Sequence, residues 1–280
     1  MAVLMASCGG PRPLVVGSKN FTEQLILGEI AAQHLERRLH LNVQRRLDLG
    51  GTLLAHEALV AGHIDVYPEY TGTALTTVLK LAAAADAAGV LETVRSEYAR
   101  RFGLRWLDPL GFNDSFAMVV RGPDARAHQL KSLTDAARCC PWRLGVGYEF
   151  LTRPDGLARL TSAYPGLRIG ASPQTMDLGL LYRALEQKQV DLVAANTTDG
   201  LLAVQDLTVL DDDAAAFPPY QGSLVAREAA LRDHVGMEAA LQELSGRISD
   251  ATMRKLNYEV DGKHRSAREV AAEFLATAGL

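Results

Sequence analysis

The sequence has few of the residues and motifs that catalysis, metal binding and nucleic-acid binding require. Only three of its 280 residues are cysteines, and none forms a Cys-x-x-Cys pair or a Cys/His cluster with metal spacing. No long basic run occurs, and the net charge is −4, which argues against a phosphate-binding groove. No apolar run is long enough to span a bilayer. P-loop, Gly-x-Ser-x-Gly and His-Glu-x-x-His motifs are absent, so we expect no enzyme, cofactor, metal or nucleic-acid partner.

The N-terminus is typical of an export signal that is cut short. Small residues precede Cys8, as they do before the cysteine that becomes lipidated in bacterial lipoproteins, but the apolar run before it is short for a complete signal. We interpret residues 1–13 as a signal remnant and linker, with Cys8 as the candidate lipid anchor. The protein would then be periplasmic or attached to the outer face of a membrane. A frayed terminus with an incidental cysteine is the alternative.

Short apolar runs alternate with helical patterns along the chain. The expected strands are residues 14–16, 42–49, 64–66, 118–120, 144–146 and 190–194. Helices are expected between them, and two have candidate start signals: Asn20 and Glu23 have capping-box spacing, and Thr52 is a suitable N-cap. This order predicts an α/β protein with mostly parallel strands. In such sheets ligands bind beyond the carboxyl ends of the strands.

One pattern occurs twice. Residues 58–66 read Ala-Leu-x4-Ile-Asp-Val, and 126 positions later residues 184–192 read Ala-Leu-x4-Val-Asp-Leu. Each copy is typical of a helix end, a tight turn and a short strand. The repeat predicts two similarly built lobes whose post-strand loops face a shared cleft. We expect Asp65 and Asp191 to have a structural role, bonding to neighbouring backbone amides, and not to form a catalytic pair.

Aromatic rings and cations gather in the turns that follow the predicted strands. The rings are Tyr67, Tyr70, Phe116, Tyr148 and Tyr220, and the cations are Lys19 and Arg153. Rings attract an apolar cation, and a lysine or arginine near a helix start favours an anion. Taken singly, each ring is more often explained by core packing and each cation by a solvated surface. Together they predict a site for a zwitterion that carries a quaternary ammonium and a carboxylate.

Several segments are typical of one family. They are residues 17–24, 50–52, 65–73, 112–117, 149–156, 198–200 and 217–220, of which Tyr67-Pro68-Glu69-Tyr70-Thr71-Gly72-Thr73 is the most specific. With these segments the chain, from about residue 14 to its C-terminus, resembles the substrate-binding proteins of osmoprotectant ABC transporters. Those transporters take up glycine betaine, choline and related compounds.

The resemblance implies a type II periplasmic-binding-protein fold, in which two α/β lobes joined by two crossing strands close on a ligand. Lobe 1 would comprise residues 14–115 and 213–280, and lobe 2 residues 116–212. The resemblance also implies a monomer that passes a small zwitterion to a membrane permease. It assigns Tyr70 and Tyr220 to an aromatic box around the ammonium. It assigns Lys19, Thr73 and Arg153 to the ligand carboxylate.

Two positions depart from the family pattern. The family commonly has tyrosine where this chain has Phe116 and Asn196. The loss of one ring would weaken binding of a small betaine by about 2- to 30-fold. Asn196 could instead bond a polar part of a larger betaine such as ergothioneine, and a polar amino acid is a second alternative ligand. An enzyme on the same scaffold would need a nucleophile–base pair or a cofactor, and the sequence supplies neither.

Overall fold

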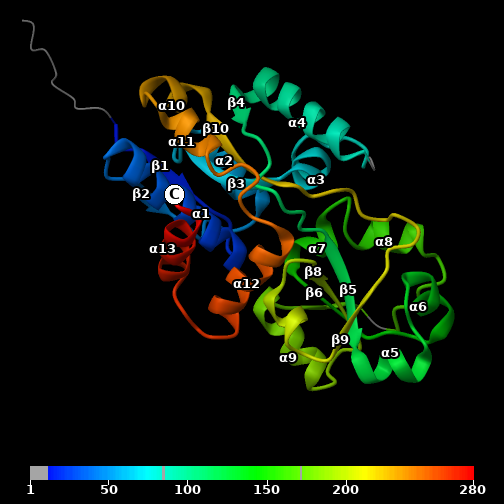
Figure 1. Ribbon diagram of the computed structural model, residues 1–280. Coiled ribbons are helices and arrows are strands. Elements are labelled where there is room, and N and C mark those ends of the chain that lie inside the picture. The colour runs from blue at the N-terminus through cyan, green and yellow to red at the C-terminus, as the bar shows by residue number, and fades with distance from the viewer. Residues whose placement is uncertain (1–11, 84–85, 171) are drawn as a thin grey trace, which may run out of the picture.

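The computed structural model describes residues 12–83, 86–170 and 172–280, which form two α/β lobes (Figure 1). The candidate anchor Cys8 lies outside these residues. The sheet of the first lobe has the strand order β2 (Gln44–Arg46), β1 (Val15–Gly17), β3 (Val66–Tyr70), β10 (Gly222–Arg227) and β4 (Leu104–Trp106). The sheet of the second has the order β7 (Gln174–Thr175), β6 (Leu144–Val146), β8 (Leu192–Asn196), β5 (Phe116–Arg121) and β9 (Leu207–Leu210).

The two sheets have the same topology. In each, the first three strands of the order are parallel and the last two are antiparallel to their neighbours. Strands β3 and β8, which follow the two copies of the sequence repeat, occupy the same central place in their sheets. The predicted fold class and the predicted pair of similarly built lobes are therefore confirmed.

Two chain segments cross between the sheets. The chain leaves the first sheet after β4 and enters the second at β5, and it returns between β9 and β10. The crossing segments pair with each other through an antiparallel bridge between Asn113 and Gln221. The Asp114 N–H also donates to the Tyr220 carbonyl at 3.0 Å. The lobes are thus connected by two segments that lie side by side.

Helices cover both sheets (Figure 1). Around the first sheet lie α1 (Thr22–Leu39), α2 (Thr52–Val60), α3 (Thr71–Thr73), a π-helical turn at Ala74–Val78, α4 (Ala87–Phe102), α10 (Glu228–Asp233), α11 (Met237–Gln242), α12 (Asp250–Asp261) and α13 (Ala267–Ala278). Around the second lie α5 (Gly122–His128), α6 (Leu133–Cys139), α7 (Tyr148–Thr152), α8 (Leu157–Ala163), α9 (Leu181–Glu186) and 3₁₀ turns at Leu178–Leu180 and Gly200–Ala203. No helix in the described residues is both long and apolar enough to cross a membrane.

Helix α1 forms the centre of the larger core. Its buried residues Ile26, Leu27, Ile30 and Leu35 recur at helical spacing, and the helix packs against α11, α12 and α13. Helix α12 also packs against the 3₁₀ turn at Gly200–Ala203 of the second lobe. Helix α12 therefore contacts both lobes.

Two predicted helix starts were wrong. The N-cap of α1 is Phe21, with no side-chain cap, and not Asn20. The carboxylate of Glu23 is buried and bonds to other elements, so no capping box forms. The N-cap of α2 is Gly51, and Thr52 is the first helical residue. In both places, contacts with distant segments prevail over the local capping pattern.

The repeated aspartates have structural roles, as predicted, although their partners differ. The buried Asp65 accepts the Val15 N–H at 2.9 Å and the Arg227 guanidinium at 2.6 Å. Asp191 bonds to Arg121 and Arg143, and hydrogen bonds from Arg143 lower its pKa to about 2. Arg227 ends β10 and Arg121 ends β5, so equivalent strands supply the arginine in each lobe.

Asp65→Ala should lower the free energy of unfolding by about 3 kcal/mol, because it leaves a partly buried guanidinium and a buried amide without their acceptor. Urea unfolding followed by circular dichroism measures this change. Asp206→Ala is the matched control, since it breaks an ion pair between two exposed side chains, Arg126 and Asp206, and should change stability little. Equal effects of the two variants would contradict the assignment.

Candidate ligand-binding cleft

A cleft of about 480 Å³ lies between the lobes, and all seven residues predicted for the site line it. They are Lys19, Tyr70, Thr73, Phe116, Arg153, Asn196 and Tyr220. Most lie at the ends of strands or in the turns that follow them. Tyr70 and Asn196 are the last residues of β3 and β8, and Lys19 follows β1. The α/β topology brings these distant segments together at one edge of each sheet.

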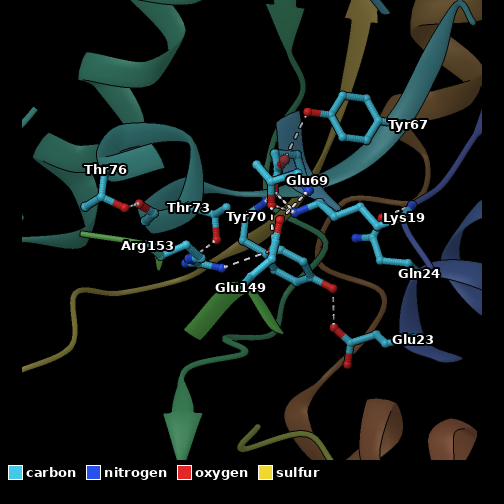
Figure 2. Close-up of polar contacts among 12 residues, drawn as sticks. Lys19, Glu23, Gln24, Tyr67, Glu69, Tyr70, Thr73, Thr76, Glu149 and Arg153 are labelled. Carbon is cyan, nitrogen blue, oxygen red and sulfur yellow. Dashed lines mark hydrogen bonds and ion pairs between the residues drawn. The ribbon is translucent and has the colours of Figure 1, made fainter. Parts of the chain in front are cut away.

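Lys19 is buried and already has an anionic partner within the protein (Figure 2). Its Nζ lies 2.5 Å from Glu69 Oε1 and 3.2 Å from Thr52 Oγ1. Glu69 also accepts the Tyr67 hydroxyl at 2.9 Å. The ammonium lies 5.1 Å from the centre of the Tyr70 ring. A ligand carboxylate at Lys19 would therefore compete with Glu69.

Arg153 is held in a fixed orientation with one nitrogen left over. Its Nε and Nη2 donate to the two carboxylate oxygens of Asp155 at 2.9 and 2.7 Å. Nη2 also donates to Thr73 Oγ1 at 3.0 Å, a contact that joins the lobes (Figure 2). Nη1 makes no hydrogen bond with a described residue, and Glu149 Oε2 lies 4.0 Å away. Arginine recognises carboxylates through such a preset fork of N–H groups.

The rings of Phe116 and Tyr220 lie next to the Arg153 guanidinium on the wall of the cleft. The Arg153 guanidinium carbon lies 4.9 Å from the centre of the Phe116 ring and 5.7 Å from that of Tyr220. Phe116 packs edge-to-face against Phe150, with ring centres 4.9 Å apart, and against Tyr220 at 5.7 Å. Aromatic faces and the anion-binding guanidinium are thus adjacent, which is the arrangement a compact zwitterion requires.

Glu149 closes the cleft from the second lobe. Its Oε1 accepts the Thr52 N–H at 2.7 Å and its Oε2 accepts the Thr52 hydroxyl at 3.2 Å. A carboxylate from α7 thus caps the N-terminus of α2 across the cleft, where the helix dipole favours negative charge. A Cβ at position 51 would lie 2.3 Å from Glu149 Oε1, so a side chain there would displace this carboxylate.

Six acidic residues that were not predicted for the site also line the cleft: Glu23, Asp114, Glu149, Asp177, Asp199 and Asp261. Glu23 accepts the Tyr70 hydroxyl at 2.7 Å and the amide of Asn257 at 3.0 Å. Burial raises the pKa of Glu23 to about 7 and that of Asp199 to about 6.

Glu23 and Asp114 lie in two of the segments that are typical of the family, residues 17–24 and 112–117. Those segments could therefore have pointed to both residues. Asn257, in contrast, lies in a C-terminal helix with no local pattern that points to the cleft. No three His, Cys, Asp or Glu side chains are placed to hold a metal ion within the described ranges.

Two lobes of equal topology with a polar and aromatic cleft between them define a solute-binding protein of the type II periplasmic fold. Residues 12–277 match the family described as the substrate binding domain of ABC-type glycine betaine transport systems. The chain belongs to this family.

Proteins of known function agree with this assignment. The chain is 35% identical to the glycine-betaine-binding protein of Pseudomonas aeruginosa, over 94% of this chain and 86% of that protein. It is also 35% identical to the ergothioneine transport permease/ergothioneine binding protein EgtU of Helicobacter pylori, over 96% of this chain but only 48% of that protein. A crystal structure of a glycine betaine/carnitine/choline ABC transporter superimposes with a TM-score of 0.80 at 30% identity, covering 95% of this chain and 98% of that one.

Lys19→Met should destabilise the protein even without ligand, by about 3–5 kcal/mol, because it leaves the charge of the fully buried Glu69 unpaired. Chemical unfolding of the unliganded protein measures this loss. The double variant Lys19→Met/Glu69→Gln should recover most of it, since neither charge remains. If Lys19→Met were as stable as the wild type, the Lys19–Glu69 pair would not contribute to the free energy of unfolding. The ammonium of Lys19 would then be available to a ligand.

Proposed function

We propose that this protein binds a quaternary-ammonium solute of the glycine betaine or choline type in the cleft and delivers it to the permease of an ABC importer. The observation that carries the proposal is the Arg153 guanidinium, fixed by Asp155, with an uncommitted Nη1 beside the Phe116 and Tyr220 rings. The glycine-betaine-binding protein of Pseudomonas aeruginosa and the superimposed glycine betaine/carnitine/choline transporter structure support the same ligand class.

In this proposal each end of the solute has its own partners. Arg153 and Thr73 bind the carboxylate, with Lys19 adding positive potential behind them. Tyr70, Phe116 and Tyr220 surround the ammonium, for which ring faces provide a favourable site without requiring hydrogen-bond donors. Asn196 lies on the cleft wall, where its amide can contact polar parts of the solute.

The proposed lobes are residues 14–115 with 213–280, and residues 116–212. This division is supported by the sheets, since all strands of each sheet fall within one of the two parts. Contacts such as Arg153 with Thr73 and Glu149 with Thr52 would form on closure and stabilise the closed state with solute inside. Binding proteins of ABC importers are extracytoplasmic, and we propose a monomer anchored through a lipidated Cys8.

A larger betaine such as ergothioneine is the second candidate solute. The acceptors near Asn196 favour it, because Asp199 accepts the Asn196 N–H at 3.1 Å and lines the same cleft. Hydrogen-bond donors on a polar ring could bond to these oxygens, and the ergothioneine-binding Helicobacter relative supports this option. Titration calorimetry with glycine betaine, choline, carnitine, ergothioneine and an unmethylated amino acid tests both candidates. No heat and no thermal shift with any methylated solute would refute the ligand class.

Arg153→Ala should weaken glycine betaine by about 10- to 100-fold, because a charge-assisted hydrogen bond to the carboxylate is lost. Choline has no carboxylate and should lose much less. Calorimetric affinities for the two solutes measure the difference. Arg153→Lys is the matched control: it keeps the charge but not the fork, and should fall between the alanine variant and the wild type. Equal losses for both solutes would contradict the carboxylate role.

Asn196→Tyr should tighten glycine betaine by about 2- to 30-fold, since it adds a ring to the wall of the cleft. Calorimetric titration of the variant with glycine betaine and with ergothioneine compares the effect of the added ring on a small and a larger betaine. If the variant loses affinity for every small betaine, the amide of Asn196 is itself a specific contact and the aromatic box is not merely incomplete.

A further inference from the structure

The Thr198 hydroxyl lies between two carboxyl groups that the proposed solute contacts do not use. Its Oγ1 is 2.6 Å from Glu23 Oε2 and 2.7 Å from Asp114 Oδ1. All three side chains are buried. Glu23 belongs to α1 of the first lobe, Asp114 to a crossing segment, and Thr198 to the turn after β8 of the second lobe. The group therefore joins the lobes at the edge of the cleft.

The side chains of Glu23, Asp114 and Thr198 make two short contacts, but with both carboxyls ionised they have only one proton to share. A threonine hydroxyl has one proton to donate, and an ionised carboxylate only accepts. With both carboxyls ionised, one of the two contacts would bring two lone pairs together without a proton. A proton on one carboxyl resolves this: that carboxyl donates to Thr198 Oγ1, and the hydroxyl donates to the other carboxylate.

Within the described part of the chain, the surroundings of these three side chains supply few hydrogen-bond donors and no cation that forms an ion pair with them. Glu23 receives the Tyr70 hydroxyl from β3 and the Asn257 amide from α12. The remaining charged neighbours are acidic: Asp199, which accepts the hydroxyl of Tyr182 in α9, and Asp261 at the end of α12.

Lys19 lies over the Tyr70 ring, with its ammonium 5.1 Å from the ring centre, and it is paired with Glu69. Neither Glu23 nor Asp114 forms an ion pair with any described residue. In addition, the buried Oδ1 of Asn257 in the cleft wall has no hydrogen-bond partner among the described residues.

We propose that Glu23, Asp114 and Thr198 form a proton-binding site that holds the turn after β8 against the first lobe and makes solute binding depend on pH. The part that concerns solute binding rests on the proposed function, and the proton site itself does not.

The burial of Glu23 and Asp114 determines whether stability rises or falls with pH. Burial raises the pKa of Glu23 to about 7, and burial together with Glu23 raises the pKa of Asp114 well above its ordinary value. A raised pKa in the folded state means that the stabilising contribution is full at low pH and is lost as the pH rises through about 7. Opening of the lobes would separate Thr198 from Glu23 and return the carboxyls to water, so the closed state is the one that retains the proton.

The first test uses the unliganded protein. From about pH 6 to about pH 8, the site should contribute about a tenfold loss in the folding equilibrium constant. This contribution should be absent from Glu23→Gln and from Asp114→Asn, since an amide supplies the missing donor without titrating. Thr198→Ser keeps the hydroxyl, and Glu92→Gln changes an exposed glutamate of α4, so both should behave as the wild type. Urea unfolding at both pH values measures these differences.

Infrared spectroscopy detects the proton directly in the folded wild type, without a comparison of stabilities. A protonated carboxyl band should be present in the wild type near neutral pH and weaker in both amide variants. A loss of stability from about pH 6 to about pH 8 that is undiminished in Glu23→Gln and Asp114→Asn, or the absence of the band from the wild type, would overturn the proton site.

The second test concerns solute binding. Affinity for the bound betaine should fall about tenfold from about pH 6 to about pH 8 in the wild type and stay nearly constant in Glu23→Gln. Calorimetry in two buffers of different ionisation enthalpy should show proton uptake on binding. An affinity independent of pH would overturn the coupling to closure. If no betaine binds at all, the proposed function fails while the unliganded experiments still decide the proton site.

Discussion

The geometry of the cleft depends on the hydrogen bonds that the Asp155 carboxylate accepts. It is buried, and it accepts two bonds from the Arg153 guanidinium and one from the Tyr220 hydroxyl at 2.7 Å. Burial by itself would raise its pKa, but the bonds from Arg153 outweigh that effect and the pKa is lowered. The ionised carboxylate therefore fixes a cation of the second lobe against a ring of the crossing segment. Such a pair needs this complete set of partners, because a buried charge without them would be strongly destabilising.

Positive and negative side chains of the cleft differ in how they are paired. The cations Lys19 and Arg153 each have a buried carboxylate partner, Glu69 and Asp155 respectively. The acids Glu23, Asp114 and Asp199 have hydroxyl and amide partners only. Neutral donors leave much of the desolvation cost of an anion in place, which is why the pKa values of these acids rise. A compact zwitterion and a proton can thus be accommodated by different parts of one cavity.

Local sequence signals predicted six of the ten strands in the described residues; they did not predict β4, β7, β9 and β10 or the partners that lie far apart in the sequence. The repeat at residues 58–66 and 184–192 predicted two similarly built lobes, and the two sheets do have the same topology. Alternating strands and helices restrict how a chain can form a sheet. The repeat could not predict that Lys19 pairs with Glu69, since 50 residues separate them and only the folded sheet brings them together. The capping-box spacing at Asn20 was misleading for the same reason: tertiary bonds from Tyr70 and Asn257 hold Glu23 elsewhere.

The two lobes also differ in a way that the repeat makes visible. At equivalent positions of the central antiparallel pairs, Tyr70 faces Gly222 in the first lobe and Asn196 faces Phe116 in the second. Each of these two pairs therefore has one ring and one smaller residue. The ring is on β3 in the first lobe, but in the second lobe it is on β5 and not on the equivalent strand β8. Gly222 has no room for a ring, because a Cβ there would lie 2.4 Å from the Phe112 ring. Asn196 is under no such constraint: it is only half-buried on the cleft wall, and Phe116 already supplies the ring of its pair. Position 196 is thus where this chain can change the polarity of its cleft without losing the aromatic surface beside Arg153.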